Sequence, residues 1–122
     1  MSGRTALDIP REAWEQYRPR KRRELDRARW ERAWGVAREV AHALKSRFGA
    51  SRVVAFGSLV QKEAFTRWSD IDLAVWGIAA ADFYKAVAFV TGFSSEFEID
   101  LVDIQMCSPA LQERIELEGV EL

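Results

Sequence analysis

The sequence predicts a single α/β (α+β) domain, in which a small three-stranded sheet packs with helices and is preceded by a long N-terminal helix. Apolar residues recur at helical spacing over residues 20–48, and three short apolar runs typical of buried strands follow. The 122 residues match the size of one domain, and the 48% of hydrophobic residues suffices for a core. These observations favour one compact unit.

The predicted elements alternate between helix and strand. Glycine at position 49 is a stop signal for the long helix, since glycine is common directly after a helix. Short apolar runs bounded by turn residues predict strands over residues 52–56, 71–76 and 97–104. Helices are predicted over residues 59–65, 79–90 and 110–118, with Ser58 as the cap of the first and Ser108-Pro109 at the start of the last.

This order gives the predicted domain organisation. Residues 1–19 form an N-terminal extension without a clear period. Residues 20–122 form the domain, which consists of the long helix over 20–48 and a core over 50–122.

Charge is unevenly distributed along the chain. Residues 1–50 contain 13 Lys/Arg and 7 Asp/Glu, whereas residues 51–122 contain 5 and 12, although the net charge is only −1. The basic half fits an anionic or acidic partner and fits a solvated helix face equally well. The run Arg18–Arg23 has no interleaved aromatic residues beyond Tyr17, so we interpret it as a basic helix start and do not expect nucleic-acid binding.

Two further features indicate where the protein acts. Cys107 is the only cysteine, so no internal disulfide can form and a reducing compartment is expected. No apolar run is long enough to cross a bilayer, and the N-terminus lacks the apolar core of a signal peptide. We therefore expect a cytoplasmic protein without a membrane partner.

Asp70 and Asp72 flank Ile71 at the start of the second predicted strand. Side chains alternate along a strand, so both carboxylates point to one face, with Cα atoms roughly 6.5 Å apart. That spacing suits two cations about 3.5–4 Å apart, as in two-metal phosphoryl-transfer sites, and Mg²⁺ prefers such oxygen ligands. Without a cation the two carboxylates would repel each other, although Asp-x-Asp also occurs in solvated loops.

Gly57-Ser58 follows a hydrophobic strand and precedes a predicted helix. Glycine lets a phosphate approach the backbone, and a helix start offers free N–H groups and a favourable dipole. An ordinary strand-to-helix turn capped by serine would look the same, so this pair acquires meaning only from its position before Asp70 and Asp72.

The third predicted strand also contains acidic residues. Alternation places Glu98 and Asp100 on one face and Asp103 on the other. An acid within an apolar strand is costly without a partner, and a metal ion supplies one. Asp100 is therefore the third candidate metal ligand, with solvent-exposed strand-end acids as the alternative.

Together these motifs resemble the polymerase-beta-like nucleotidyltransferase superfamily, and in particular its minimal nucleotidyltransferase (MNT) branch. The resemblance covers roughly residues 35–122 and implies a small mixed sheet packed with helices. The resemblance extends to residues 111–120, which are similar to the last helix of the family. The motifs that carry it are Phe56-Gly57-Ser58, eleven intervening residues, Ser69-Asp70-Ile71-Asp72-Leu73, and Glu98-Ile99-Asp100-Leu101-Val102.

The resemblance implies an activity and a partner. Members of the minimal branch are commonly antitoxins that transfer AMP from ATP to a tyrosine hydroxyl of a HEPN-domain ribonuclease toxin, in a type VII-like HEPN/MNT pair. The expected cofactors are two Mg²⁺ ions held by Asp70, Asp72 and Asp100, with ATP as substrate, and a hetero-oligomer with the toxin is expected. A non-catalytic antitoxin that binds the toxin, or an enzyme that modifies a small molecule or RNA, are the alternatives.

One departure from the family pattern concerns the triphosphate. The family often has Gly and Arg directly after Gly-Ser, whereas this chain has Leu59 and Val60 there. Lys62 and Arg67 are therefore the candidate basic contacts for the nucleotide, beside Gly57 and Ser58.

Overall fold

The structure is a computed structural model that describes residues 20–122, so the predicted extension of residues 1–19 lies outside the described residues. The predicted order of helices and strands is confirmed, except for the helix predicted between the first two strands. The elements are α2 (Arg20–Phe48), β1 (Arg52–Phe56), the 3₁₀ turns η2 (Gly57–Val60) and η3 (Lys62–Ala64), β2 (Ile71–Trp76), α3 (Ala80–Thr91), β3 (Ile99–Asp103), the 3₁₀ turn η4 (Ile104–Met106), α4 (Pro109–Glu118) and β4 (Val120–Glu121).

The sheet is mixed, as expected, but it has four strands instead of three. Their order is β3-β2-β1-β4, with β1 antiparallel to both β2 and β4, and β2 parallel to β3. The extra strand β4 pairs Val120 with Ala55 and Glu121 with Val54. Two residues are too few to show alternation, so this strand depends on β1 and leaves no signal in the sequence.

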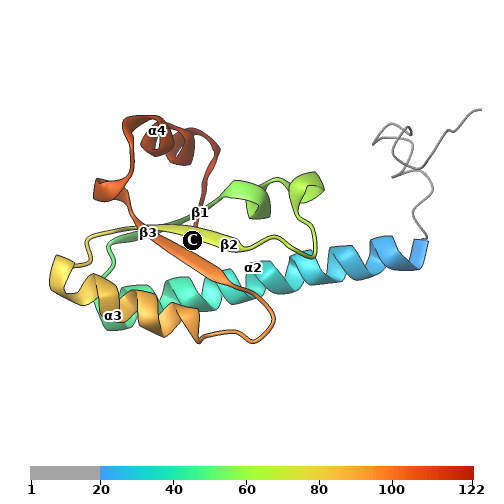
Figure 1. Cartoon of the computed structure of the whole chain (residues 1–122), viewed down its shortest axis with the longest axis horizontal. Helices are drawn as coiled ribbons and strands as arrows, with labels where there is room; N and C mark the ends of the chain where they lie inside the picture. Colours follow the sequence, from blue (N-terminus) through green and yellow to red (C-terminus); the bar gives the residue numbers. More distant parts are fainter. Residues whose placement is uncertain (1–19) are drawn as a thin grey trace, which may run out of the picture.

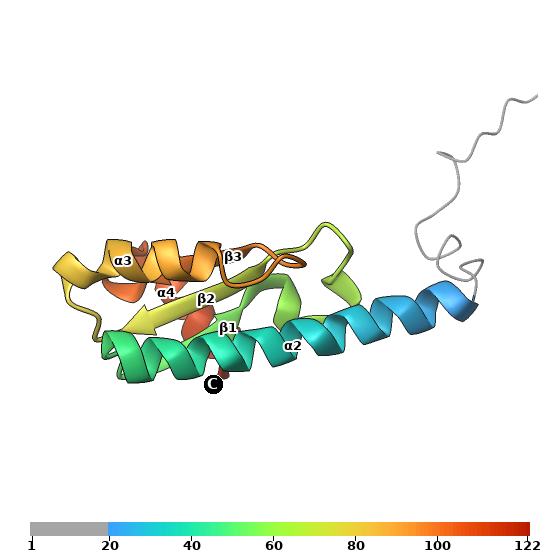
Figure 2. The ribbon, with the colours of Figure 1, turned by 90° about the horizontal axis from the view of Figure 1, so that it is seen from below.

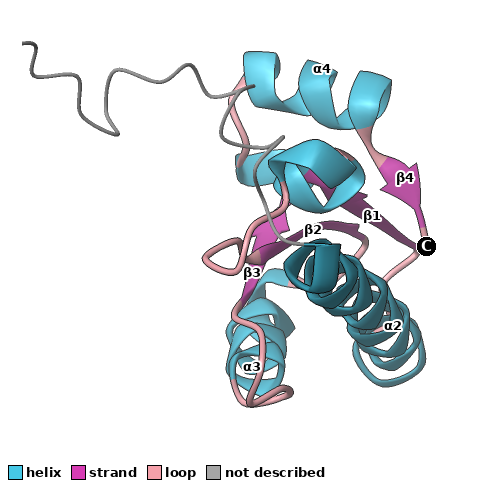
Figure 3. Ribbon diagram, turned by 90° about the vertical axis from the view of Figure 1, so that its right-hand side faces the viewer, coloured by secondary structure: helices cyan, strands magenta, loops and turns pink. Residues whose placement is uncertain are grey.

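The elements form three layers. Helices α2 and α3 run side by side over one face of the sheet, and α4 lies over the other face (Figures 1 and 3). The larger core lies between the sheet and the helix pair, where Leu44, Leu73 and Val90 are almost fully buried. A smaller core under α4 contains Val54, Ala74, Ile104 and Ile115.

Helix α2 has the predicted bounds. It ends where Gly49 adopts a φ of 76° and the N–H of Ala50 donates to the carbonyl of Leu44. Its early turns extend beyond the sheet (Figure 2). Although α2 is 29 residues long, none of the helices described over residues 20–122 is apolar enough to span a membrane.

Two predicted elements need correction. The helix predicted over residues 59–65 is instead the pair of short turns η2 and η3, because Gln61 between them is extended. The strand predicted over residues 97–104 is shorter and covers Ile99–Asp103, because the Asp103 carboxylate accepts a hydrogen bond from the N–H of Gln105 and starts η4. By contrast, Ser108 caps α4 as predicted, with its side chain accepting from the N–H of Leu111.

Candidate active site

The candidate residues come together at one edge of the sheet. Because β2 and β3 are parallel and β1 is antiparallel to them, the start of β2, the start of β3 and the end of β1 meet there. Asp72 on β2 pairs in register with Asp100 on β3 and with Phe56 on β1. Asp70 lies directly before β2, and Gly57 lies directly after β1.

Strand alternation separates the carboxylates from the larger core. Ile71 and Leu73 are fully buried against the α2 and α3 side, while Ala74 belongs to the smaller core under α4. Asp72 is two residues before Ala74 and therefore faces the α4 side, where it is half-buried. Asp100 is two residues before Val102, which packs on the same smaller core, so its phase is the same.

Asp72 is the electrostatic centre of this group. Burial, together with the negative charges of Asp100 and Asp70, raises the pKa of its carboxyl group from 3.8 to about 6. The negative charges of Asp70 and Asp100 therefore act on the half-buried Asp72 carboxylate. A cation at this place would relieve both the burial penalty and the repulsion.

Gly57 packs directly against the Asp72 carboxylate. Its φ of 74° is in the left-handed region, and a Cβ atom added to it would overlap with Oδ2 of Asp72. The absence of a side chain thus lets the Asp72 carboxylate lie directly against the backbone of Gly57. Ser58 is half-buried next to Gly57, but its hydroxyl does not cap η2, so the predicted capping role is wrong.

The donor set fits a magnesium ion that is shared with a substrate. Among the described residues, no group of three or more His, Cys, Asp or Glu side chains is close enough to hold a metal ion by itself. Mg²⁺ typically takes one or two carboxylates and completes its shell with water and phosphate oxygens. Asp70, Asp72 and Asp100 suit that mode of binding better than a closed protein cage.

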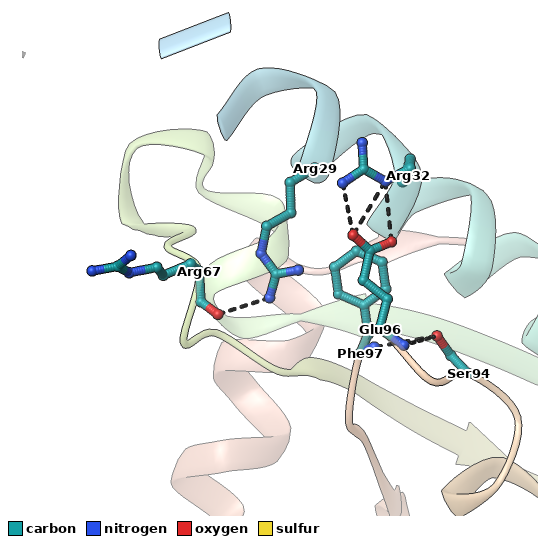
Figure 4. A network of polar contacts seen from close by, with 6 residues as sticks. All are labelled: Arg29, Arg32, Arg67, Ser94, Glu96 and Phe97. Atoms are coloured by element: carbon teal, nitrogen blue, oxygen red, sulfur yellow. Dashed lines mark hydrogen bonds and ion pairs between the residues drawn. The ribbon is translucent and has the colours of Figure 1, made fainter. Parts of the chain in front are cut away.

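The two basic candidates stack on tryptophan rings. The Lys62 ammonium lies 5.4 Å from the centroid of the Trp30 ring, and the Arg67 guanidinium carbon lies 5.2 Å from that of Trp68. Figure 4 shows the Arg67 side chain directed away from the Arg29 and Glu96 cluster, while its backbone carbonyl faces Arg29. Their role as triphosphate contacts thus remains a prediction.

One residue that contacts these loops is not among the site residues predicted from the sequence. Arg29 on α2 donates a hydrogen bond of 2.9 Å to the carbonyl oxygen of Arg67, 38 residues later in the chain. Motif spacing cannot indicate such a contact, because an arginine on an amphipathic helix is indistinguishable from a solvated one. Only the packing of α2 beside the loop reveals it.

The comparisons with known proteins agree with this geometry. Residues 38–122 match the family described as polymerase beta, nucleotidyltransferase, and the chain belongs to that family. The fold is also that of a structure described as a minimal nucleotidyltransferase, with 28% sequence identity, a TM-score of 0.54, and coverage of 81% of this chain and 94% of that one. The predicted resemblance is thereby confirmed.

Two other similar structures are toxin–antitoxin complexes. A mutant of the MntA–HpeT toxin–antitoxin is 19% identical, with a TM-score of 0.57 and 70% of each chain covered. A toxin–antitoxin with AMP-PNP is 21% identical, with a TM-score of 0.58 and 70% of each chain covered. At these identities the likeness establishes the shared fold. No curated protein sequence gives a significant match.

Proposed function

We propose that this nucleotidyltransferase is the antitoxin of a type VII-like HEPN/MNT pair and transfers AMP from ATP to a tyrosine hydroxyl of its cognate HEPN ribonuclease toxin. The observation that carries the proposal is the cluster of three carboxylates at one end of the strands, where the charges of Asp70 and Asp100 act on Asp72 and the Asp72 carboxylate lies against Gly57. The toxin–antitoxin structures with the same fold, one of them with AMP-PNP, support it.

The reaction is a nucleophilic substitution at the α-phosphorus of ATP. The tyrosyl oxygen forms a bond to that phosphorus, the bond to the bridging oxygen of the β-phosphate breaks, and pyrophosphate leaves. The proton of the hydroxyl passes to a carboxylate, and we assign this role to Asp100, which is exposed and in register with Asp72. Tyrosine O-AMP and pyrophosphate are the products.

Each other site residue has a proposed part in holding the donor. Asp70 and Asp72 would bind Mg²⁺, which supplies charge neutralisation along the triphosphate when it is present. Gly57 would let the triphosphate approach the backbone, and the Ser58 hydroxyl would donate a hydrogen bond to it. Lys62 and Arg67 would reach the outer phosphates once they leave their tryptophan rings. Use of ATP accords with the cytoplasmic location that we propose.

The direct test is transfer of label from α-³²P-ATP to a candidate HEPN protein in the presence of Mg²⁺. We expect the partner to be labelled by the wild-type chain and to remain unlabelled with the Asp70→Asn/Asp72→Asn double variant. A matched control is Asp103→Asn, because Asp103 lies on the same strand as Asp100 but binds the backbone of η4. Absence of label with the wild-type chain would refute AMP transfer to that partner.

A second experiment separates catalysis from simple binding. The toxin is expressed in cells together with wild-type antitoxin or the Asp72→Asn variant, and growth is measured. Rescue only by the wild type supports enzymatic neutralisation. Full rescue by Asp72→Asn would instead establish a non-catalytic antitoxin that acts by covering the toxin.

A further inference from the structure

Arg29 on α2 lies between the two loops that lead into the aspartate-bearing strands. Its guanidinium carbon is 4.5 Å from the centroid of the Phe97 ring, just before β3, and 5.6 Å from that of Phe65, before β2. Both rings are buried and tilted against each other, with centroids 6.4 Å apart. The same guanidinium donates to the carbonyl of Arg67 in the first loop (Figure 4).

The second loop is bound to α2 one turn later. Arg32 donates three hydrogen bonds to the Glu96 carboxylate, the shortest one 2.7 Å long (Figure 4). Ser94 in turn accepts hydrogen bonds from the N–H groups of Glu96 and Phe97. Helix α2 therefore contacts the approach to Asp70 and Asp72 through Arg29, and the approach to Asp100 through both arginines.

The first loop is itself ordered by short-range hydrogen bonds. The Ser69 hydroxyl accepts from the N–H of Thr66, and the N–H of Ser69 donates to the carbonyl of Thr66. The Thr66 hydroxyl accepts from the N–H of Trp68. This closed turn ends one residue before Asp70, so a hydrogen bond to Arg67 fixes the direction in which the chain enters β2.

One atom of Arg29 is a buried hydrogen-bond donor. Its Nε is buried, and among the described residues it has no hydrogen-bond acceptor. A buried donor without an acceptor destabilises a fold, and a methionine in the same place would avoid that penalty. The guanidinium is therefore difficult to explain by packing alone, whereas its planar shape suits a group that must stack between two rings and still reach a carbonyl.

We propose that Arg29 is a positioning residue for the nucleotidyl-transfer site: it sets the entry of β2 and β3 so that Asp70, Asp72 and Asp100 are held at the distances that a metal–triphosphate complex requires. The proposal rests on the proposed function for its catalytic consequence. Its structural part, the fixing of the two loops by α2, is independent of the reaction.

The test compares Arg29→Met with Arg38→Met in the full chain. Methionine keeps the aliphatic bulk against the rings but removes the donors, and Arg38 on the same helix is also stacked on a ring, at 5.7 Å from Trp34. Amide hydrogen exchange without metal or nucleotide is the first readout. Arg29→Met is expected to accelerate exchange in residues 66–70 by about tenfold and to leave β1 unchanged, and Arg38→Met to change neither.

The second readout is the affinity for a non-hydrolysable ATP analogue with Mg²⁺, measured by calorimetry. Arg29→Met is expected to weaken it about tenfold, while Arg38→Met keeps the wild-type affinity. Wild-type exchange and affinity in Arg29→Met would overturn the proposal, as would faster exchange throughout the sheet, which indicates a merely structural role. If the wild-type chain itself fails to bind the analogue, the proposed function fails, and the exchange experiment still decides the role of Arg29.

Discussion

The two faces of the sheet are built very differently. On one face, α2 and α3 lie side by side (Figure 2), and the side chains of β1 and β2 that point toward them are almost fully buried, whereas Leu101 of β3 is partly buried. On the other face, α4 covers a small core around Val54, Ala74 and Ile115, and the edge of the sheet beyond it carries Asp72 and Asp100. Most of the buried apolar side chains thus lie on the face that α2 and α3 cover, and the carboxylates lie on the other face, beyond its smaller core.

This difference explains how the carboxylates can be tolerated. In each strand the neighbours of the acids, such as Ile71, Leu73 and Ile99, point into the larger core and fix the strand. The acids themselves occupy the alternate positions, half-buried or exposed, and Asp72 lies against Gly57 instead of a packed side chain. A single strand can therefore serve both faces, since its side chains alternate.

The largest expected effect is that of removing one carboxylate from the α4 side of the sheet. Asp72→Asn and Asp100→Asn are each expected to lower the rate of AMP transfer by about 10³-fold, because a metal ligand or proton acceptor contributes several kcal/mol to the transition state. The initial rate of labelling measures this. Asp103→Asn should retain nearly the full rate, and an equal loss there would contradict the assignment of Asp100.

The face of the sheet that α2 and α3 cover should contribute most to the free energy of unfolding. Leu73→Ala removes a fully buried side chain from the larger core and is expected to destabilise the protein by about 3 kcal/mol. Leu111→Ala removes a partly buried side chain under α4 and is expected to cost about 1 kcal/mol. Urea denaturation of both variants gives the comparison, and similar values would show that the two faces contribute equally.

Two glycines separate backbone strain from crowding at the site. Gly49 and Gly57 have nearly the same φ, but only Gly57 has the Asp72 carboxylate where a Cβ would lie. Gly49→Ala is expected to cost about 1 kcal/mol from the left-handed conformation alone, and Gly57→Ala about 2 kcal/mol. Thermal denaturation measures both. Equal losses would mean that the Asp72 side chain moves aside freely.

The smallest expected effect is a pH dependence of stability in metal-free buffer. The pKa of Asp72 is raised in the folded protein, so between 3.8 and about 6 the unfolded chain releases a proton that the folded chain keeps. Stability from this group is therefore full below pH 3.8 and is lost as the pH rises through about 6. After allowance for solvent screening of the half-exposed side chain, the loss is about 1 kcal/mol.

The measurement is the difference between wild type and Asp72→Asn across this range. The subtraction removes other groups, such as Glu96, whose pKa is lowered by hydrogen bonding to Arg32 and whose contribution has the opposite sign. Asp72→Asn should be the more stable of the two at pH 7 and lose that advantage at low pH. A constant difference would argue against a raised pKa for Asp72.

Local patterns predicted most of what lies within one element. The period of α2 gave its bounds, and alternation put Asp70 and Asp72 on one face and distinguished Asp100 from Asp103. The strand phase is a property of consecutive residues, so the sequence contains it. The family resemblance predicted that Gly57-Ser58 binds the nucleotide, which the two residues alone could not indicate.

Features that depend on distant partners were missed. Strand β4 forms by pairing with Val54 and Ala55 of β1. The residues Val120 and Glu121 alone show no pattern that predicts a strand. The turns after Gly57 replaced a predicted helix because Gln61 is extended, although its neighbours favour a helix. The hydrogen bond from Arg29 to the carbonyl of Arg67 depends on how α2 packs across the sheet, so the sequence does not predict it.

The position of Arg29 along the chain has a consequence for how such a domain is divided. The family match begins at residue 38, in the middle of α2, whereas Trp30 donates to the carbonyl of Leu59 and Arg32 binds Glu96 from the preceding turns. A protein shortened to the matched region would keep every acidic residue of the motif and lose the supports that hold the motif in place. The segment that the family model matches and the segment that supports the site are then two different parts of the same chain.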